Sequence, residues 1–209
     1  MDILRKEFPR PKWITPIKDP FETLIITIIS QNTNDRNTAR AFEKLSNAFQ
    51  IAPQALANAE TTEIEECLKV AGLYRNKAKV IKEVSRIILE DLGGSLEKIL
   101  NMPLDEARRA LMQLPGVGAK TADVVLLFAA KKPTIPVDTH VNRVSKRLGL
   151  APVDGDYEKV RKALQRLYPP EDYLDAHIFL ILLGRKFCRA RNPLCRQCPV
   201  SSLCPSRKV

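Results

Sequence analysis

The spacing of apolar and polar positions along the chain is helical in nearly every segment. Apolar residues recur every three or four positions in 35–49 and in 74–92, as an amphipathic helix requires. Residues 21–30 are apolar on nearly every side, which predicts a buried helix. That helix follows Asp19-Pro20, where aspartate is a favoured N-cap and proline fits the first helical position. No segment alternates with the two-residue period of a strand, so the sequence predicts an all-α fold.

Capping residues, glycines and prolines delimit the other helices. We expect them over 61–72, 104–112, 119–130, 138–148, 157–167 and 171–187. Residues 20–131 are predicted to form one helical domain, with a boundary at Lys131-Lys132-Pro133. The first 19 residues are too short to fold alone, and the C-terminal helices need a packing partner. We therefore expect residues 1–19 and 132–209 to form a second, discontinuous domain.

The charge of the chain favours a polyanionic partner. The 209 residues carry a net charge of +10, and the sequence pI is near 9.5. An apolar content of 44% argues against disorder. No apolar run reaches the roughly 18 residues that a membrane span needs, and the N-terminus lacks a signal-peptide core. We expect a cytoplasmic, nucleoid-associated monomer of prokaryotic type, which binds nucleic acid and no membrane.

A glycine turn, Leu114-Pro115-Gly116-Val117-Gly118, lies between two predicted helices and forms a helix-hairpin-helix. Glycines adopt backbone angles that other residues resist, and bare amides at a helix start bind phosphate oxygens. Such a contact holds the DNA backbone without selecting a base sequence. The alternative is an ordinary interhelical turn. The preceding Leu-Pro, the following lysine and the net charge favour phosphate binding, so we assign Gly116, Val117 and Gly118 to DNA contact.

Lys120 and Asp138 are candidates for chemistry. A lysine beside the positive end of a helix is not stabilised by the helix dipole, which helps to lower its pKa. In a fraction of the molecules it is then expected to be a neutral amine, which can attack carbon. A nearby carboxylate would stabilise a developing cation. The alternatives are a solvated surface lysine and an aspartate that only caps a helix. His140 is predicted either to support that cap or to touch DNA.

Four of the five cysteines lie in the last 22 residues, spaced C-x6-C-x2-C-x5-C: Cys188, Cys195, Cys198 and Cys204. Without a secretory signal, this grouping indicates a metal site rather than disulfides. Zinc sites with four cysteines commonly use two C-x2-C pairs, whereas this chain has one, so the spacing favours an iron–sulfur cluster over zinc. Cys67 stands apart and is predicted to be a small core residue.

Together these motifs resemble the endonuclease III family of helix-hairpin-helix DNA glycosylases. The matching segments follow the family order over most of the chain: PFETLIITIIS at 20–30, GLYRNKA at 72–78, LPGVGAKTA at 114–122, VDTHVNRV at 137–144, and the cysteine spacing at 188–204. The resemblance implies a six-helix barrel joined to a cluster domain made by both chain ends. It also implies a [4Fe–4S] cluster on Cys188, Cys195, Cys198 and Cys204, and a monovalent cation on the carbonyls of Met112, Leu114 and Val117.

The implied activity is that of a bifunctional DNA glycosylase and AP lyase of base excision repair, which removes oxidised pyrimidines from duplex DNA. The resemblance implies Lys120 as nucleophile, Asp138 as catalytic carboxylate, a Schiff-base intermediate and strand nicking by β-elimination. The family flips its target base out of the helix. By position, Leu73 and Asn32 would fill the gap. The commonest bacterial pattern has Ala-Gln where this chain has Gln31-Asn32.

Two alternatives differ from this hypothesis. One is a mismatch glycosylase of the same fold that acts on uracil, thymine or adenine. Lys120 argues against strictly monofunctional members, and the chain length argues against the adenine type. The other alternative is a non-catalytic iron–sulfur protein that binds DNA or senses redox state.

Overall fold

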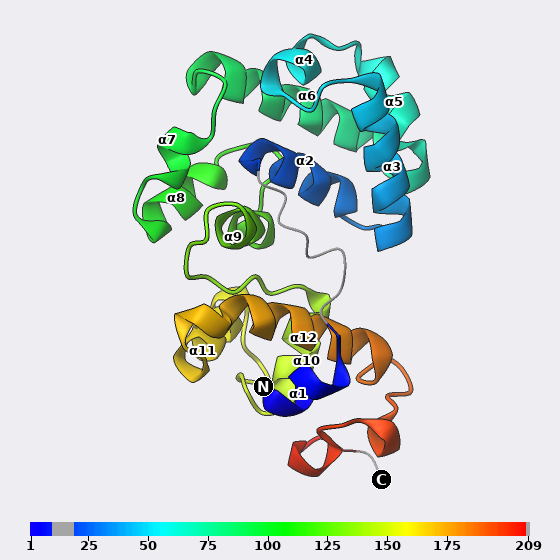
Figure 1. Ribbon diagram of the computed structural model, residues 1–209, viewed down its shortest axis with the longest axis vertical. Helices are drawn as coiled ribbons and strands as arrows, with labels where there is room; N and C mark the ends of the chain where they lie inside the picture. The colour runs from blue at the N-terminus through cyan, green and yellow to red at the C-terminus, as the bar shows by residue number, and fades with distance from the viewer. Residues whose placement is uncertain (10–18, 208–209) are drawn as a thin grey trace. The chain divides into compact units, whose positions relative to one another are not determined.

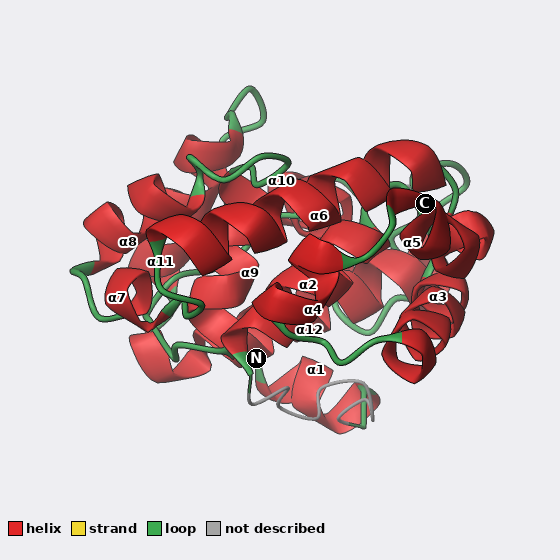
Figure 2. Ribbon diagram, turned by 90° about the horizontal axis from the view of Figure 1, so that it is seen from above, coloured by secondary structure: helices red, strands yellow, loops and turns green. Residues whose placement is uncertain are grey.

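The computed structural model describes residues 1–9 and 19–207 and consists of helices and loops, with no strand over these residues (Figures 1 and 2). The predicted all-α fold is confirmed. None of the described helices is long and apolar enough to cross a membrane. The chain divides into two compact units, Ile17–Lys131 and Met1–Pro16 with Lys132–Val209. The expected boundary after residue 19 adjoins residues 10–18, which lie outside the described residues.

The first unit is built around α2 and α6. Its elements are α2 (Pro20–Ser30), α3 (Asp35–Ala48), α4 (Pro53–Asn58), α5 (Thr61–Leu68), the 3₁₀ helix η2 (Lys69–Ala71), α6 (Tyr74–Asp91), α7 (Glu97–Leu100), α8 (Leu104–Leu111) and α9 (Ala119–Phe128). As its uniform apolarity predicts, α2 is buried almost throughout, and Leu24, Ile25 and Ile29 are fully inaccessible. The Asp19 carboxylate caps it by accepting the Glu22 amide at 2.9 Å.

Two short helices of this unit, α4 and α7, were not predicted. They span 6 and 4 residues, which is too short for a 3.6-residue period to be visible in the sequence. Tertiary packing stabilises α4, because it lies against α6 and fully buries Leu56 (Figure 1).

The second unit is built around α12. Its elements are α1 (Asp2–Glu7), α10 (Thr139–Arg147), α11 (Tyr157–Leu167), the 3₁₀ helix η3 (Pro170–Asp172), α12 (Tyr173–Lys186), and the 3₁₀ helices η4 (Cys195–Gln197) and η5 (Ser201–Leu203). Most of α12 is buried, with α10 and α1 packed against it (Figure 1). Its observed start at Tyr173 is two residues later than expected, because the residues before it form η3.

The N-terminal helix α1 joins this unit through its apolar side. Leu4 and Phe8 are buried, and the Phe8 ring lies 6.2 Å from that of Phe187 at the end of α12. Arg5 adds ion pairs with Asp172 at 2.6 Å and Asp175 at 3.2 Å. Exposed ion pairs contribute little, so the buried leucine and phenylalanine provide most of the attachment.

Candidate functional site

The glycine turn joins α8 to α9 and needs glycine at one of its two glycine positions. Gly116 has φ +71°, in the left-handed region that side chains disfavour. Gly118 has φ −90° and ψ 178°, an extended conformation that any residue adopts. Of the two glycines, only Gly116 therefore uses the backbone freedom that glycine offers. Both residues are exposed, so the turn presents bare backbone at the surface.

The amides of this turn are not equivalent. The Val117 amide donates to the Leu114 carbonyl at 3.1 Å, and its side chain is buried. Among the described residues, the amides of Gly116 and Gly118 make no such bond. An anion at the turn would therefore meet the two glycine amides, whereas Val117 shapes the turn from inside. The cation expected on the carbonyls of Met112, Leu114 and Val117 stays a prediction.

Two further contacts hold the hairpin in place. Arg108 of α8 pairs with the fully buried Asp123 of α9 at 3.0 Å, which ties the two helices together. The Gln31 side chain, just after α2, donates to the Gly116 carbonyl at 3.0 Å and to Thr121 Oγ1 at 3.3 Å. In the sequence, Gln31 differs from other positions only as a departure from the bacterial pattern. Its amide can bridge two acceptors, which an alanine cannot do.

Lys120 and Asp138 each lie at the start of a helix, in different units. Lys120 is the second residue of α9 and is half-buried. Asp138 is the N-cap of α10, where its Oδ1 accepts the Val141 amide at 2.7 Å. The preceding Val137 amide donates to the Tyr157 hydroxyl at 3.3 Å. The predicted capping role of Asp138 is confirmed, and one carboxylate oxygen is held by the Val141 amide.

His140 packs between α10 and α12. Its Nδ1 lies 3.1 Å from Arg143 Nη2, and because a guanidinium only donates, Nδ1 is the acceptor. A Cβ atom added at Gly184 of α12 would lie 3.0 Å from the imidazole, so the absent side chain makes room for the ring. Burial lowers the pKa of His140. These contacts favour the structural role over the DNA contact.

Asn32 and Leu73, the two residues expected to fill the gap left by a flipped base, share an unusual backbone. Their φ angles are +54° and +50°, in the left-handed region that non-glycine residues seldom adopt. Both are exposed, and the Leu73 side chain is 60% accessible. The large apolar side chain of Leu73 is held in water on a strained turn and has no packing role in the protein. Insertion into DNA would require a side chain exposed in this way.

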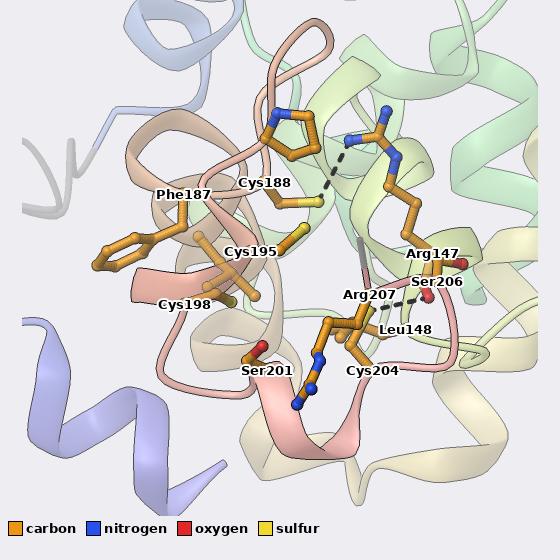
Figure 3. Close-up of a pocket in the computed structure, with 12 residues that line it drawn as sticks. Arg147, Leu148, Phe187, Cys188, Cys195, Cys198, Ser201, Cys204, Ser206 and Arg207 are labelled. Carbon is orange, nitrogen blue, oxygen red and sulfur yellow. Dashed lines mark hydrogen bonds between the residues drawn. The ribbon is translucent and has the colours of Figure 1, made fainter. Parts of the chain in front are cut away.

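Cys188, Cys195, Cys198 and Cys204 line one pocket together with Leu148, Leu183, Phe187 and Pro193 (Figure 3). None is in a disulfide. Burial raises the pKa of the Cys198 thiol, and the other three cysteines raise it further. Arg147 and Arg207 also line this pocket, and their positive charges oppose the repulsion between ionised thiols.

Within the described residues, no group of three or more His, Cys, Asp and Glu side chains is arranged to hold a metal ion. The four cysteines nevertheless line one pocket, and the kind of metal centre that they hold stays a prediction.

Arg143 and Arg147, four residues apart on α10, reach the first of these cysteines. Arg147 Nη1 lies 3.6 Å from Cys188 Sγ (Figure 3). The same atom donates to the Arg189 carbonyl at 2.7 Å. Arg143 Nε donates to the Cys188 carbonyl at 2.9 Å. Neither arginine was predicted as a site residue, although their i, i+4 spacing in VDTHVNRVSKR places them on one helix face.

Comparison with known proteins adds to this geometry. The family model described as "HhH-GPD superfamily base excision DNA repair protein" matches residues 25–170. Endonuclease III of Thermotoga maritima is 39% identical, over 95% of this chain and 87% of the relative. A trapped covalent endonuclease III–DNA intermediate superposes with a TM-score of 0.85 and 35% identity, over 98% of this chain and 92% of that structure. A thermostable thymine-DNA glycosylase superposes with a TM-score of 0.76 and 25% identity, over 99% and 92%.

Proposed function

Because the chain belongs to the endonuclease III family of the HhH-GPD superfamily, we propose that it excises oxidised pyrimidines from duplex DNA and then nicks the strand. It is a DNA glycosylase and AP lyase of base excision repair, with damaged duplex DNA as its partner. The similarity to a structure trapped as a covalent DNA intermediate, over nearly the whole chain, carries this conclusion.

Lys120 is the proposed nucleophile. Its amine attacks C1′ of the damaged nucleotide, the N-glycosidic bond breaks, and the base leaves with the bonding electrons. Loss of a proton from the amine and opening of the sugar give a Schiff base. Removal of a proton from C2′ then expels the 3′ phosphate by β-elimination. The place of Lys120 directly after the hairpin supports this role, because a hairpin that holds the DNA backbone also holds the sugar.

Asp138 is the residue proposed to stabilise the positive charge that develops on the sugar. As the base leaves, positive charge develops on the sugar, and a fixed carboxylate stabilises it without reorganisation. The hydrogen bond from the Val141 amide supports this role, since it holds the carboxylate in place before substrate binds.

The surface contacts divide between holding the backbone and opening the helix. Gly116 and Gly118 bind a phosphate through their amides, and the net charge of +10 draws in the polyanion. Leu73 and Asn32 enter the stack when the base leaves it. The exposed, left-handed turns on which both residues sit support this assignment.

A [4Fe–4S] cluster is proposed on Cys188, Cys195, Cys198 and Cys204. When bound, such a cluster supplies a rigid, positively charged anchor for the thiolates and so organises the C-terminal loop. Arg147 orients Cys188 through its N–H···S contact. Apolar side chains line the same pocket beside the half-buried cysteines.

A trapping experiment on DNA with an abasic site tests this function. Borohydride should reduce the Schiff base and join the wild-type protein covalently to the DNA. Lys120→Gln should neither trap nor nick but should bind the same DNA, because the amide removes the nucleophile and keeps the shape. Trapping by Lys120→Gln would assign the chemistry to another amine. A wild-type protein that binds but never traps would favour the non-catalytic alternative.

A mismatch glycosylase is the second candidate, because the thymine-DNA glycosylase fold covers 99% of this chain. A panel of duplexes separates the two. Excision of an oxidised pyrimidine at a higher single-turnover rate than thymine or uracil opposite guanine supports the first function, and the reverse order supports the second.

A further inference from the structure

Lys77 is a buried cation that takes no part in the chemistry proposed above. It lies in the first turn of α6 with 3% of its surface accessible, and burial lowers the pKa of its ammonium. Its Nζ donates to the Ile29 carbonyl at 2.8 Å and to the Ala71 carbonyl at 2.9 Å. Both acceptors are uncharged. Burying an ammonium whose hydrogen-bond acceptors are uncharged carbonyls costs folding free energy. The burial of Lys77 therefore calls for a functional or structural explanation.

The two carbonyls belong to the segments that carry Asn32 and Leu73. Ile29 lies in the last turn of α2, just before Asn32, and Ala71 ends η2, just before Leu73. The Lys77 backbone amide also donates to the Leu73 carbonyl at 3.0 Å. One residue is thus bonded to both segments, although they are some forty positions apart in the sequence.

Both segments need such support. Asn32 and Leu73 have left-handed backbones, which persist only where the surroundings hold them. Gln31 ties the first segment to the hairpin through the Gly116 carbonyl. Lys77 joins the first segment to the second.

We propose that Lys77 is a positioning residue for base extrusion, whose buried ammonium fixes the separation of the two turns that present Asn32 and Leu73 to DNA. This inference rests on the proposed function, in which those two side chains fill the gap. Asn32 and Leu73 can fill the space left by one extruded base only if their turns are held at a fixed separation. If that separation varied, base extrusion from paired DNA would slow, whereas the reaction at an abasic site, where no base has to be extruded, would not.

The first test needs no DNA. Lys77→Met removes the ammonium and keeps an unbranched side chain. Lys82→Met is the matched control, because Lys82 lies on the same helix and donates to the Ala59 carbonyl at 2.7 Å, away from both turns. Amide hydrogen exchange in residues 30–34 and 71–75 should accelerate at least roughly tenfold in Lys77→Met, which corresponds to about 1.4 kcal/mol. It should not change in the control. Unchanged exchange in Lys77→Met would overturn the proposal.

The second test uses paired and pre-opened substrates. Single-turnover excision from a fully paired duplex should be at least roughly tenfold slower in Lys77→Met, again a change of about 1.4 kcal/mol. Borohydride trapping on abasic DNA should stay near the wild-type level. Adding Lys77→Met to Leu73→Ala should slow excision little further, because both act on one step. Equal slowing on both substrates would assign Lys77 to general stability and refute the proposal.

Two further outcomes are also decisive. If Lys77→Met does not fold, Lys77→Gln is tested in its place. The glutamine side chain is too short to reach both the Ile29 and the Ala71 carbonyl, so amide exchange in residues 30–34 and 71–75 should still accelerate. A wild-type protein that excises no base would refute the proposed function. The exchange experiment would still decide whether Lys77 holds the turns together.

Discussion

Gly116 lies so close to Val80 of α6 that a Cβ atom added to the glycine would be 2.6 Å from Val80 Cγ1. The hairpin therefore packs its backbone directly onto the first unit's central helix. Gly116 also has a left-handed φ, so two independent constraints require glycine there. At Gly118 neither applies, because an added Cβ would meet nothing within 4 Å.

The two glycines should respond differently to substitution. Gly116→Ala should lower the free energy of unfolding by about 1–3 kcal/mol from its backbone angle alone, with overpacking against Val80 in addition. Gly118→Val should cost at most about 1 kcal/mol, since valine is a poorer N-cap than glycine. It should nonetheless weaken DNA binding, because the side chain covers the amides. Urea unfolding and a binding isotherm measure the two effects. Unchanged affinity in Gly118→Val would remove the hairpin from the DNA contact.

Asp138→Asn separates helix capping from catalysis. Asparagine caps a helix as well as aspartate does, so thermal stability should stay near the wild-type value. Excision should fall roughly 10²–10³-fold, the usual loss when one preorganised electrostatic contact to a transition state is removed. DNA affinity should not decrease, because a negative charge near phosphate has been removed. Normal turnover would leave residue 138 with its capping role alone.

Leu73→Ala tests insertion into the stack. Excision from a paired duplex should slow much more than trapping on an abasic site, where the helix is already open. Leu167→Ala is the matched control, because that leucine is 55% accessible and belongs to the other unit. The same loss on both substrates would argue against a role of Leu73 in base extrusion.

Cys198→Ser and Cys67→Ser test the cluster. Wild-type protein purified without added metal should be coloured and contain about four irons per chain. Cys198→Ser should lose most of that iron and destabilise the C-terminal loop. Cys67→Ser should retain it, because Cys67 packs half-buried against the core of the first unit. Colourless, fully active protein with one zinc per chain would exclude the cluster.

His140 should make stability depend on pH in a defined direction. Burial lowers its pKa below the ordinary 6.5, with Arg143 and Arg185 acting in the same sense and Asp138 opposing them. As pH falls through 6.5, the unfolded chain gains a proton that the folded chain does not, so folding stability falls. In urea unfolding between about pH 8 and pH 5, the free energy of unfolding should decrease less in His140→Gln than in the wild type. Identical slopes would contradict the assignment.

Local patterns in the sequence were enough for the long helices and for the identity of the chemical groups. A helix of 11 to 18 residues, such as α2, α6 or α11, repeats its apolar face often enough for the period to be visible. The capping of α2 by Asp19 was predictable for the same reason, because a cap acts on amides only three residues away. The short helices α1, α4 and α7 were missed, since packing rather than period stabilises them.

Tertiary structure decided the surroundings of each candidate residue. Gly116 and Gly118 look alike in LPGVG, but the left-handed φ of Gly116 and its close approach to Val80 make glycine necessary there and not at Gly118. Lys77 looks like any helical lysine, and only the fold directs it inward onto two carbonyls from distant segments. Side-chain chemistry and helical period are local properties and can be deduced from the sequence. Close approach between distant segments depends on how the whole chain packs, and no local pattern encodes it.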